Sequence, residues 1–138
     1  MIYIVKSKDE TRALAKSFAT KLKKGDIVCL NGDLGAGKTT FTQFVFSALG
    51  VKSPVSSPTF SILKIYQGDK FRLNHFDTYR ITDMEAIEAG FDEILEDKDS
   101  VSFIEWSENI SSLIPSKHID VNIKILDENS REFEVKYE

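Results

Sequence analysis

The sequence has little cysteine, histidine, proline and arginine, and each shortage narrows the class of protein. Of its 138 residues, one is cysteine, two are histidines and three are prolines. The single cysteine, Cys29, excludes an internal disulfide and is typical of a reducing compartment, where we expect it to be a small buried residue on a strand. Arginine occurs only at positions 12, 72, 80 and 131, so no segment carries the several arginines of a nucleoside-kinase lid.

Long apolar runs and an excess of positive charge are also missing. The apolar N-terminus, MIYIV, is too short for a signal peptide, and no run approaches the ~20 apolar residues that span a bilayer. The formal net charge is −4. This balance argues against strong autonomous binding to nucleic acid, because such binding needs clustered Lys and Arg side chains. We therefore expect a cytoplasmic protein without a membrane-bound segment.

What the chain does have is the composition of an ordinary globular domain. Hydrophobic residues make up 41% and charged residues 29% of the sequence, as in most soluble proteins. A chain of this length is most simply one domain, residues 1–138. It holds no internal repeat, low-complexity tract or linker.

Hydrophobic periodicity divides the chain into helices and strands. Leu14, Phe18 and Leu22 recur every four residues, which predicts a helix between Ser7 and Gly25. Further helices are predicted for residues 39–50 and from Thr82 onward, the latter continuing or restarting through 91–95. Strands are predicted for residues 2–5, 26–30, 61–67, 70–77, 101–106, 118–126 and 131–137.

The segment LNGDLGAGKTTF, residues 30–41, carries a phosphate-binding pattern. Gly32, four further residues, then Gly37, Lys38 and Thr39 match G-x-x-x-x-G-K-[ST]. Glycines let backbone N–H groups converge on an anion, and the helix that follows adds the positive end of its dipole. On this interpretation Lys38 reaches the outer phosphates and the Thr39 hydroxyl binds Mg²⁺. With a strand before the loop and a helix after it, the sequence predicts a three-layer α/β P-loop NTPase fold with a central mixed sheet of about seven strands.

Two carboxylates lie where strands would deliver them to that loop. Glu105 ends the apolar run 101–104, and Asp77 ends the strand that contains His75. Mg²⁺ is bound by anionic oxygen ligands, and the oxygen that attacks the phosphate must be held in position. Both acids are therefore candidates for these two roles. His75 alternates with Asp77 and shares its face, and a hydrogen-bonded structural histidine is its simpler interpretation. With no cysteine or second histidine close to it in sequence, zinc at His75 is disfavoured.

The residues alone leave several questions open. Trp106, directly after Glu105, is equally compatible with the core and with a wall of the site. No guanine-reading N-K-x-D pattern is present, yet purine identity stays open. The scarcity of arginine favours a nucleotide hydrolase or switch over a small-molecule kinase. A P-loop kinase and a non-hydrolysing, nucleotide-gated adaptor remain as alternatives.

Four motifs in one order, GDLGAGKTT, SSPTF, HFDTYR and IEW, resemble the bacterial TsaE (YjeE) family, ATPases of tRNA threonylcarbamoyladenosine synthesis. The similarity covers essentially the whole chain. It implies ATP rather than GTP, with Mg²⁺ as cofactor. It also implies docking on a pair of transferase-fold partners, TsaD and TsaB, so that tRNA is met only indirectly, through the complex. In that picture the partners carry out the chemistry on tRNA, and ATP hydrolysis by a weak, partner-stimulated ATPase resets the complex.

The resemblance further implies roles for particular residues. Glu105 matches the metal-associated acid of the family, and Asp77 matches a further acid near the metal or the attacking water. Thr11 matches a threonine near the adenine, and Thr59 resembles a switch-like loop residue that would sense the γ-phosphate. Tyr79 and Arg80 complete the histidine-containing motif without an assigned role. The triphosphate-binding stretch is matched by Gly35, Ala36, Gly37, Lys38, Thr39 and Thr40.

Overall fold

The computed structural model describes all residues except Leu34, Ser57 and residues 59–61, and the described chain forms a mixture of helices and strands. The strands are β1 (Ile2–Val5), β2 (Ile27–Asn31), β3 (Leu63–Gln67), β4 (Arg72–Asp77), β5 (Ser100–Glu105), β6 (Ile119–Ile125) and β7 (Arg131–Tyr137). The helices are α1 (Lys8–Thr20), α2 (Lys38–Ala48), α3 (Asp83–Glu88), α4 (Phe91–Glu96) and the 3₁₀ helix η1 (Ser107–Leu113).

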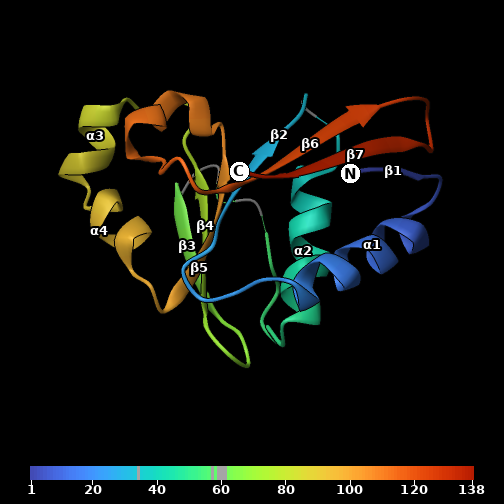
Figure 1. Cartoon of the computed structure of the whole chain (residues 1–138), viewed down its shortest axis with the longest axis horizontal. Coiled ribbons are helices and arrows are strands. Elements are labelled where there is room, and N and C mark those ends of the chain that lie inside the picture. Colours follow the sequence, from blue (N-terminus) through green and yellow to red (C-terminus); the bar gives the residue numbers. More distant parts are fainter. Residues whose placement is uncertain (34, 57, 59–61) are drawn as a thin grey trace.

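The strands form one mixed sheet of seven strands in the order β1-β7-β6-β2-β5-β4-β3 (Figure 1). Its centre, β6-β2-β5-β4, is parallel, while β7, β1 and β3 each run antiparallel to the strand beside them. In this register Leu30 lies opposite Glu105, and Glu105 lies opposite Asp77. The carboxyl ends of the central strands therefore meet at one edge of the sheet.

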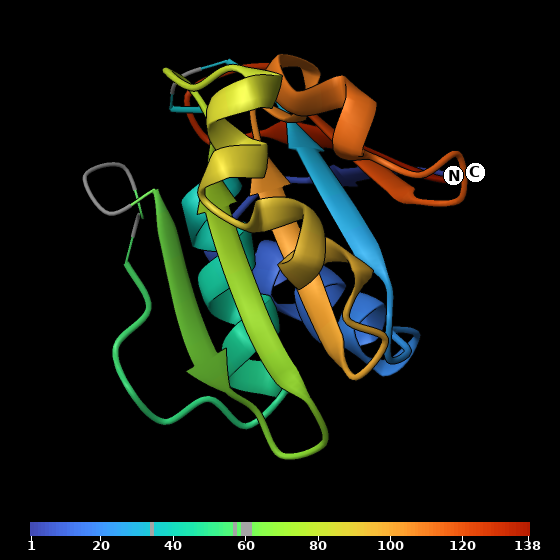
Figure 2. The same cartoon turned by 90° about the vertical axis from the view of Figure 1, so that its left-hand side faces the viewer.

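Helices cover both faces of the sheet, which confirms the predicted three layers. Helices α1 and α2 lie on one face, and α3, α4 and η1 lie on the other (Figures 1 and 2). Strand β2 shows why both layers form: Val28 and Leu30 face the first core, and Ile27 and Cys29 face the second. Cys29 is 1% exposed, which confirms that it is a buried strand residue.

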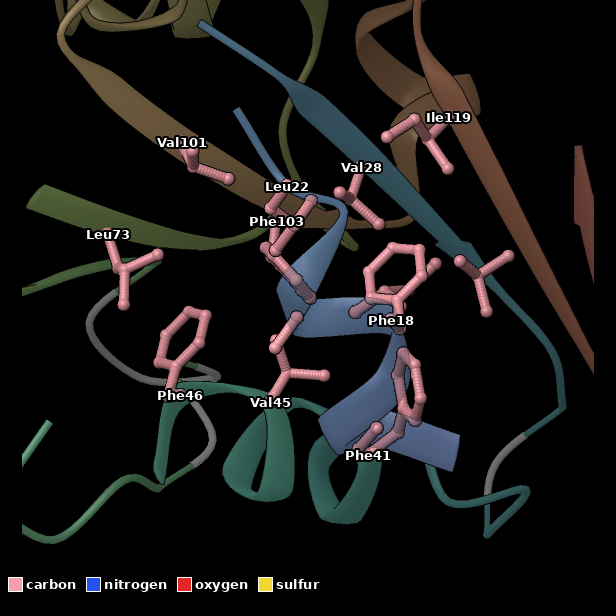
Figure 3. Close-up of a cluster of buried hydrophobic side chains, with 14 of the residues drawn as sticks. Phe18, Leu22, Val28, Phe41, Val45, Phe46, Leu73, Val101, Phe103 and Ile119 are labelled. Atoms are coloured by element: carbon pink, nitrogen blue, oxygen red, sulfur yellow. The ribbon is translucent and has the colours of Figure 1, made fainter. Parts of the chain in front are cut away.

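The larger core fixes the helix that follows the glycine-rich loop. Phe41 and Phe46 of α2 are 0% exposed, and Phe41 lies 5.5 Å from the ring of Phe18 in α1, between ring centroids. Phe46 lies 5.1 Å from Phe103 of β5 (Figure 3). Burying each such ring contributes roughly 1.5–3 kcal/mol. Because α2 is anchored along this face, its N-terminus is held in place against the sheet.

One helix boundary differs from the expectation, and another decides between the two alternatives that the sequence left open. Helix α1 ends at Thr20 rather than near Gly25, because the N–H groups of Lys21 and Leu22 bond to carbonyls three residues back at 3.0 and 3.3 Å. That tighter turn brings Leu22 into the core. The helix predicted from Thr82 does not continue but restarts: α3 and α4 are separated by Gly90, whose φ of 82° interrupts the helix.

Strand β5 also ends one position before the predicted range does, at Glu105, since Trp106 adopts a left-handed conformation with φ of 62°. Short helix η1 follows it and was not predicted. Both expected hairpins are present, as β3-β4 and β6-β7, although residue 61 of the first lies outside the described residues. Across the described chain, no helix has both the length and the hydropathy of a membrane span.

Candidate functional site

The glycine-rich loop connects β2 to α2, as the phosphate-binding pattern requires. A Cβ atom on Gly32 would lie 2.7 Å from the Ile123 carbonyl oxygen of β6, so only glycine fits there. Gly37 caps α2 with φ of 106°, a conformation that side chains other than glycine rarely adopt. Added Cβ atoms on Gly35 and Gly37 would meet no atom within 4 Å. The loop therefore faces open space, as a cradle for a ligand must.

Lys38, the first residue of α2, is a buried cation without a carboxylate partner. Its side chain is covered, with 6% of the residue exposed. The Nζ atom donates to the Gly32 carbonyl at 2.8 Å and lies 4.6 Å from the centre of the Trp106 ring. No ion pair to Lys38 is formed by the described residues, and the undescribed five carry no carboxylate. A buried charge left without a counter-ion costs several kcal/mol, so this position is suited to an incoming anion.

A cavity of about 300 Å³ opens beside the loop. Five residues that the sequence assigned to nucleotide binding line it: Thr11, Gly35, Ala36, Gly37 and Thr40. Its other lining residues are Ser7, Lys8, Glu128, Asn129, Arg131 and Phe133.

The other described residues assigned to nucleotide binding, Gly32, Lys38 and Thr39, do not line this cavity. Gly32 and Lys38 meet through their hydrogen bond on the inner side of the loop. Thr39 is half-buried in the first turn of α2. Thr59 lies outside the described residues.

The β6-β7 hairpin contributes a wall of the cavity that sequence reasoning missed. Arg131 Nε donates to the Ala36 carbonyl of the loop at 3.2 Å, and Nη1 donates to the Asp127 carbonyl at 2.9 Å. Arg131 thus ties the hairpin turn to a loop 95 residues earlier. The sequence predicts the hairpin, but only the strand order, with β6 beside β2, places it at the loop.

The two predicted acids lie side by side at the carboxyl ends of β5 and β4. Glu105 is 6% exposed and Asp77 is 8% exposed. One oxygen of each is already bound: Glu105 Oε2 lies 2.9 Å from His75 Nε2, and Asp77 Oδ1 accepts from the Tyr79 N–H at 3.0 Å. In the described chain, the ligand-type atoms of Asp77, His75 and Glu105 do not all lie within 4.8 Å of one another, so the three residues do not form a ready metal-binding cluster.

The motifs HFDTYR and IEW meet in one corner next to the loop. The Thr78 hydroxyl lies 2.9 Å from the Glu105 carbonyl oxygen and 2.6 Å from that of Trp106. Asn109 donates to the carbonyls of Thr78 and Tyr79 at 2.9 and 3.0 Å. These bonds hold the left-handed turn at Trp106, whose ring stands over Lys38. Trp106 is thus half-buried beside Lys38, and it belongs to neither of the two core clusters.

A parallel-centred sheet between two helical layers, with a glycine-rich loop between β2 and α2, defines an α/β domain of the P-loop NTPase fold. Within that class the chain belongs to the TsaE family. The family model "Threonylcarbamoyl adenosine biosynthesis protein TsaE" matches residues 5–133. This family takes part in tRNA threonylcarbamoyladenosine biosynthesis.

Individual relatives agree with this placement. The chain is 46% identical to the tRNA threonylcarbamoyladenosine biosynthesis protein TsaE of Rickettsia prowazekii, over 94% of this chain and 90% of that protein. The TsaE protein of Bacillus subtilis is 40% identical, over 90% of this chain and 77% of its own length. The crystal structure of Bacillus subtilis YdiB is similar with a TM-score of 0.81 and 34% identity, covering 96% of this chain and 82% of YdiB.

Proposed function

We propose that this chain binds and hydrolyses Mg-ATP as the nucleotide-driven component of the cytoplasmic machinery that makes threonylcarbamoyladenosine in tRNA. The observation that carries the proposal is Lys38, a buried ammonium group at the end of a glycine-rich loop with no carboxylate to neutralise it. An acid pair, Glu105 and Asp77, lies at the ends of the strands next to that loop. A cationic cradle next to strand-end acids suits a nucleoside triphosphate and its metal ion.

In this proposal one set of residues binds the phosphates and another set binds the metal ion. Loop N–H groups and Lys38 hold the phosphates, which requires Lys38 to leave the Gly32 carbonyl and the Trp106 ring. The residues that suit Mg²⁺ are Thr39, Asp77 and Glu105, because hydroxyl and carboxylate oxygens are its preferred ligands. When bound, Mg²⁺ supplies neutralisation of charge on the outer phosphates. Glu105 or Asp77 orients the attacking water through the carboxylate oxygen that is not held by His75 or Tyr79.

The cavity beside the loop suits the base and sugar of the nucleotide. It adjoins the phosphate cradle through Gly35 and Gly37, and Thr11 and Thr40 line it. Asn129 and Arg131 also line it. Such a mixed apolar and polar pocket holds a small ligand while a few placed groups set its orientation. Adenine is the base that we propose for it.

TsaD and TsaB are the partners that we propose, and tRNA is reached through them. Family membership supports this assembly, because the relatives bear the name of a tRNA-modification pathway. The net charge of −4 fits a component that does not itself grip the tRNA backbone.

The proposal is tested by Lys38→Ala, with Lys16→Ala as a matched control on the exposed surface of α1. Phosphate release from Mg-ATP is measured for each variant alone and after addition of the cognate TsaD and TsaB proteins. ATP binding is measured by calorimetry. We expect Lys38→Ala to lose binding or turnover and Lys16→Ala to match the unsubstituted chain. Retention of both activities by Lys38→Ala would overturn the proposal.

The fate of the γ-phosphate separates hydrolysis from the two alternatives. Labelled γ-phosphate is expected as free phosphate, at a rate that the partner proteins raise. Its appearance on an acceptor would instead identify a kinase. Binding of ATP without consumption, even with both partners present, would identify a nucleotide-gated adaptor.

A further inference from the structure

The side chain that contacts Glu105 has no role in the function described so far. His75 lies on β4, is 0% exposed, and its Nε2 atom is 2.9 Å from Glu105 Oε2. Its ring is packed at 6.0 Å, between ring centroids, against Phe46 of α2 in an edge-on arrangement. No other hydrogen bond to the Glu105 carboxylate is made within the described chain. Among the described residues, only the His75 imidazole therefore fixes the orientation of the Glu105 carboxylate.

The surroundings of the ring also fix which nitrogen carries the proton. His75 Nδ1 is buried without a hydrogen-bond partner in the described part of the chain. A buried N–H without an acceptor is rarer and costlier than a buried lone pair without a donor. The favoured tautomer therefore has its proton on Nε2, where it is donated to Glu105 Oε2, and a lone pair on Nδ1.

We propose that His75 is a positioning residue for the site: its Nε2–H holds Oε2 of Glu105 and leaves the other carboxylate oxygen to face the bound nucleotide's metal or water. This inference rests on the proposed function, since it assigns His75 a task only if Glu105 acts in Mg-ATP hydrolysis. Hydrogen bonds of this kind orient acids around metal sites, and their loss commonly lowers activity 10- to 100-fold.

Packing around the pair explains why one hydrogen bond can have so large an effect. A glutamate has three rotatable side-chain bonds, so an untethered carboxylate occupies several orientations. In the β4-β5 register Asp77 lies opposite Glu105. His75 lies two residues before Asp77 on β4, on the same face of the sheet. Phe46 closes the other side of the imidazole. The ring cannot turn away without opening the core, so the donor stays at one position relative to Glu105.

The kinetic test uses variants that separate the hydrogen bond from the volume of the ring. His75→Phe keeps an aromatic ring against Phe46 but removes the donor, and His75→Gln keeps an amide N–H that can reach Glu105. With partner proteins present, we expect His75→Phe to lower kcat 10- to 100-fold with KM for Mg-ATP changed less than about threefold. His75→Gln should recover most of kcat. Thermal unfolding of each variant confirms that it is folded.

A double-mutant cycle shows whether His75 acts through Glu105. In the Glu105→Ala background, His75→Phe should lower the remaining rate no further, because the group that it positions is gone. An equal loss in both backgrounds would mean that His75 supports the fold rather than Glu105, and would overturn the inference. Unchanged kcat in His75→Phe alone would overturn it as well.

Nitrogen NMR of the histidine rings tests the contact without ATP. The chain has two histidines, so His118→Gln assigns the spectrum. We expect His75 to carry its proton on Nε2, protected from exchange with water, and to lose that protection in Glu105→Ala. A proton on Nδ1 would overturn the inference. If the unsubstituted chain released no phosphate even with its partners, the hydrolysis proposal would fail, and with it the positioning role of His75 in that reaction. The NMR result would still decide whether the hydrogen bond is present.

Discussion

Two histidine–carboxylate pairs in the described chain have nearly equal nitrogen–oxygen distances but differ in burial. His75 Nε2 lies 2.9 Å from Glu105, with side-chain exposures of 0% and 7%. His118 Nε2 lies 3.1 Å from Asp120, with exposures of 20% and 24%. Distance alone would rank these pairs together. Their surroundings separate them, because solvent partly screens the half-buried pair and hardly reaches the buried one.

The second pair is bonded to groups outside the proposed nucleotide site. His118 Nδ1 bonds to the Pro115 carbonyl at 2.8 Å, so both ring nitrogens are occupied. The Cys29 sulfur completes a group whose ligand-type atoms lie within 4.8 Å of one another. Burial raises the pKa of the Cys29 thiol to about 11, so this thiol is neutral at ordinary pH. The second pair thus stabilises the start of β6. It lies beside Cys29, on the face of the sheet opposite to α2.

Removing the carboxylate from each pair should give the largest contrast. We expect Glu105→Ala to lower the partner-stimulated rate of phosphate release by about a hundredfold or more, as loss of a positioned acid or base commonly does. Asp120→Ala should leave that rate unchanged. The measurement is phosphate release from Mg-ATP, with native folding of both variants checked by circular dichroism.

The result also decides between the two acids at the site. A normal rate in Glu105→Ala would transfer the water-positioning role to Asp77, and the comparison of the two pairs would then say nothing about catalysis. A reduced rate in Asp120→Ala, with folding intact, would instead mean that the half-buried pair acts on the site from the far side of β2.

The two halves of the site were predictable to different degrees. The loop from Gly32 to Thr39 is continuous in sequence, so its spacing alone indicated a cradle for phosphate. The positions of Glu105 and Asp77 at strand ends were also predictable, because parallel strands present their carboxyl ends at one edge. The hydrogen bond from His75 to Glu105 was not predictable, because it requires β4 and β5 to be neighbours in the sheet. For the same reason Arg131 was missed.

Stability should show the next largest contrast. His75→Ala removes a fully buried ring, opens space against Phe46 and leaves Glu105 unpartnered, so it should lower the free energy of unfolding by about 2–4 kcal/mol. His118→Ala removes a partly exposed ion pair and should cost less than about 1 kcal/mol. Urea denaturation of both variants checks this. Equal losses would show that burial does not distinguish the pairs energetically.

The fold was predicted better in its elements than in their ends. The period of Leu14, Phe18 and Leu22 identified α1, but its end was misplaced because Leu22 reaches the core from a tighter turn rather than from a continued helix. For β5 a strand end near Glu105 was expected and is present, but the turn that follows it was not predictable. The left-handed turn at Trp106 depends on the Thr78 hydroxyl, which comes from β4's end and is remote in sequence.

The smallest expected effect is a pH dependence of stability that belongs to the half-buried pair, His118 and Asp120. Burial lowers the pKa of His118, but hydrogen bonding to the Pro115 carbonyl, together with Asp120 and the charge of Glu138, raises it more, so the pKa lies above its ordinary 6.5. Protonated His118 is thus favoured in the folded chain, and its stabilisation is complete below the ordinary pKa and lost as pH rises through the folded pKa.

Comparison of the unsubstituted chain with His118→Gln across this window checks that sign. The stabilisation of the unsubstituted chain relative to His118→Gln should be greatest near about pH 5 and should stop changing with pH above about pH 8, where the imidazole is neutral in both states. Neutral Cys29 contributes no charge in this range, and Asp120→Asn should remove most of the dependence. A difference that grew with rising pH would show that the neutral ring is the stabilising form, and that the Pro115 carbonyl and Asp120 do not act as acceptors for a protonated ring.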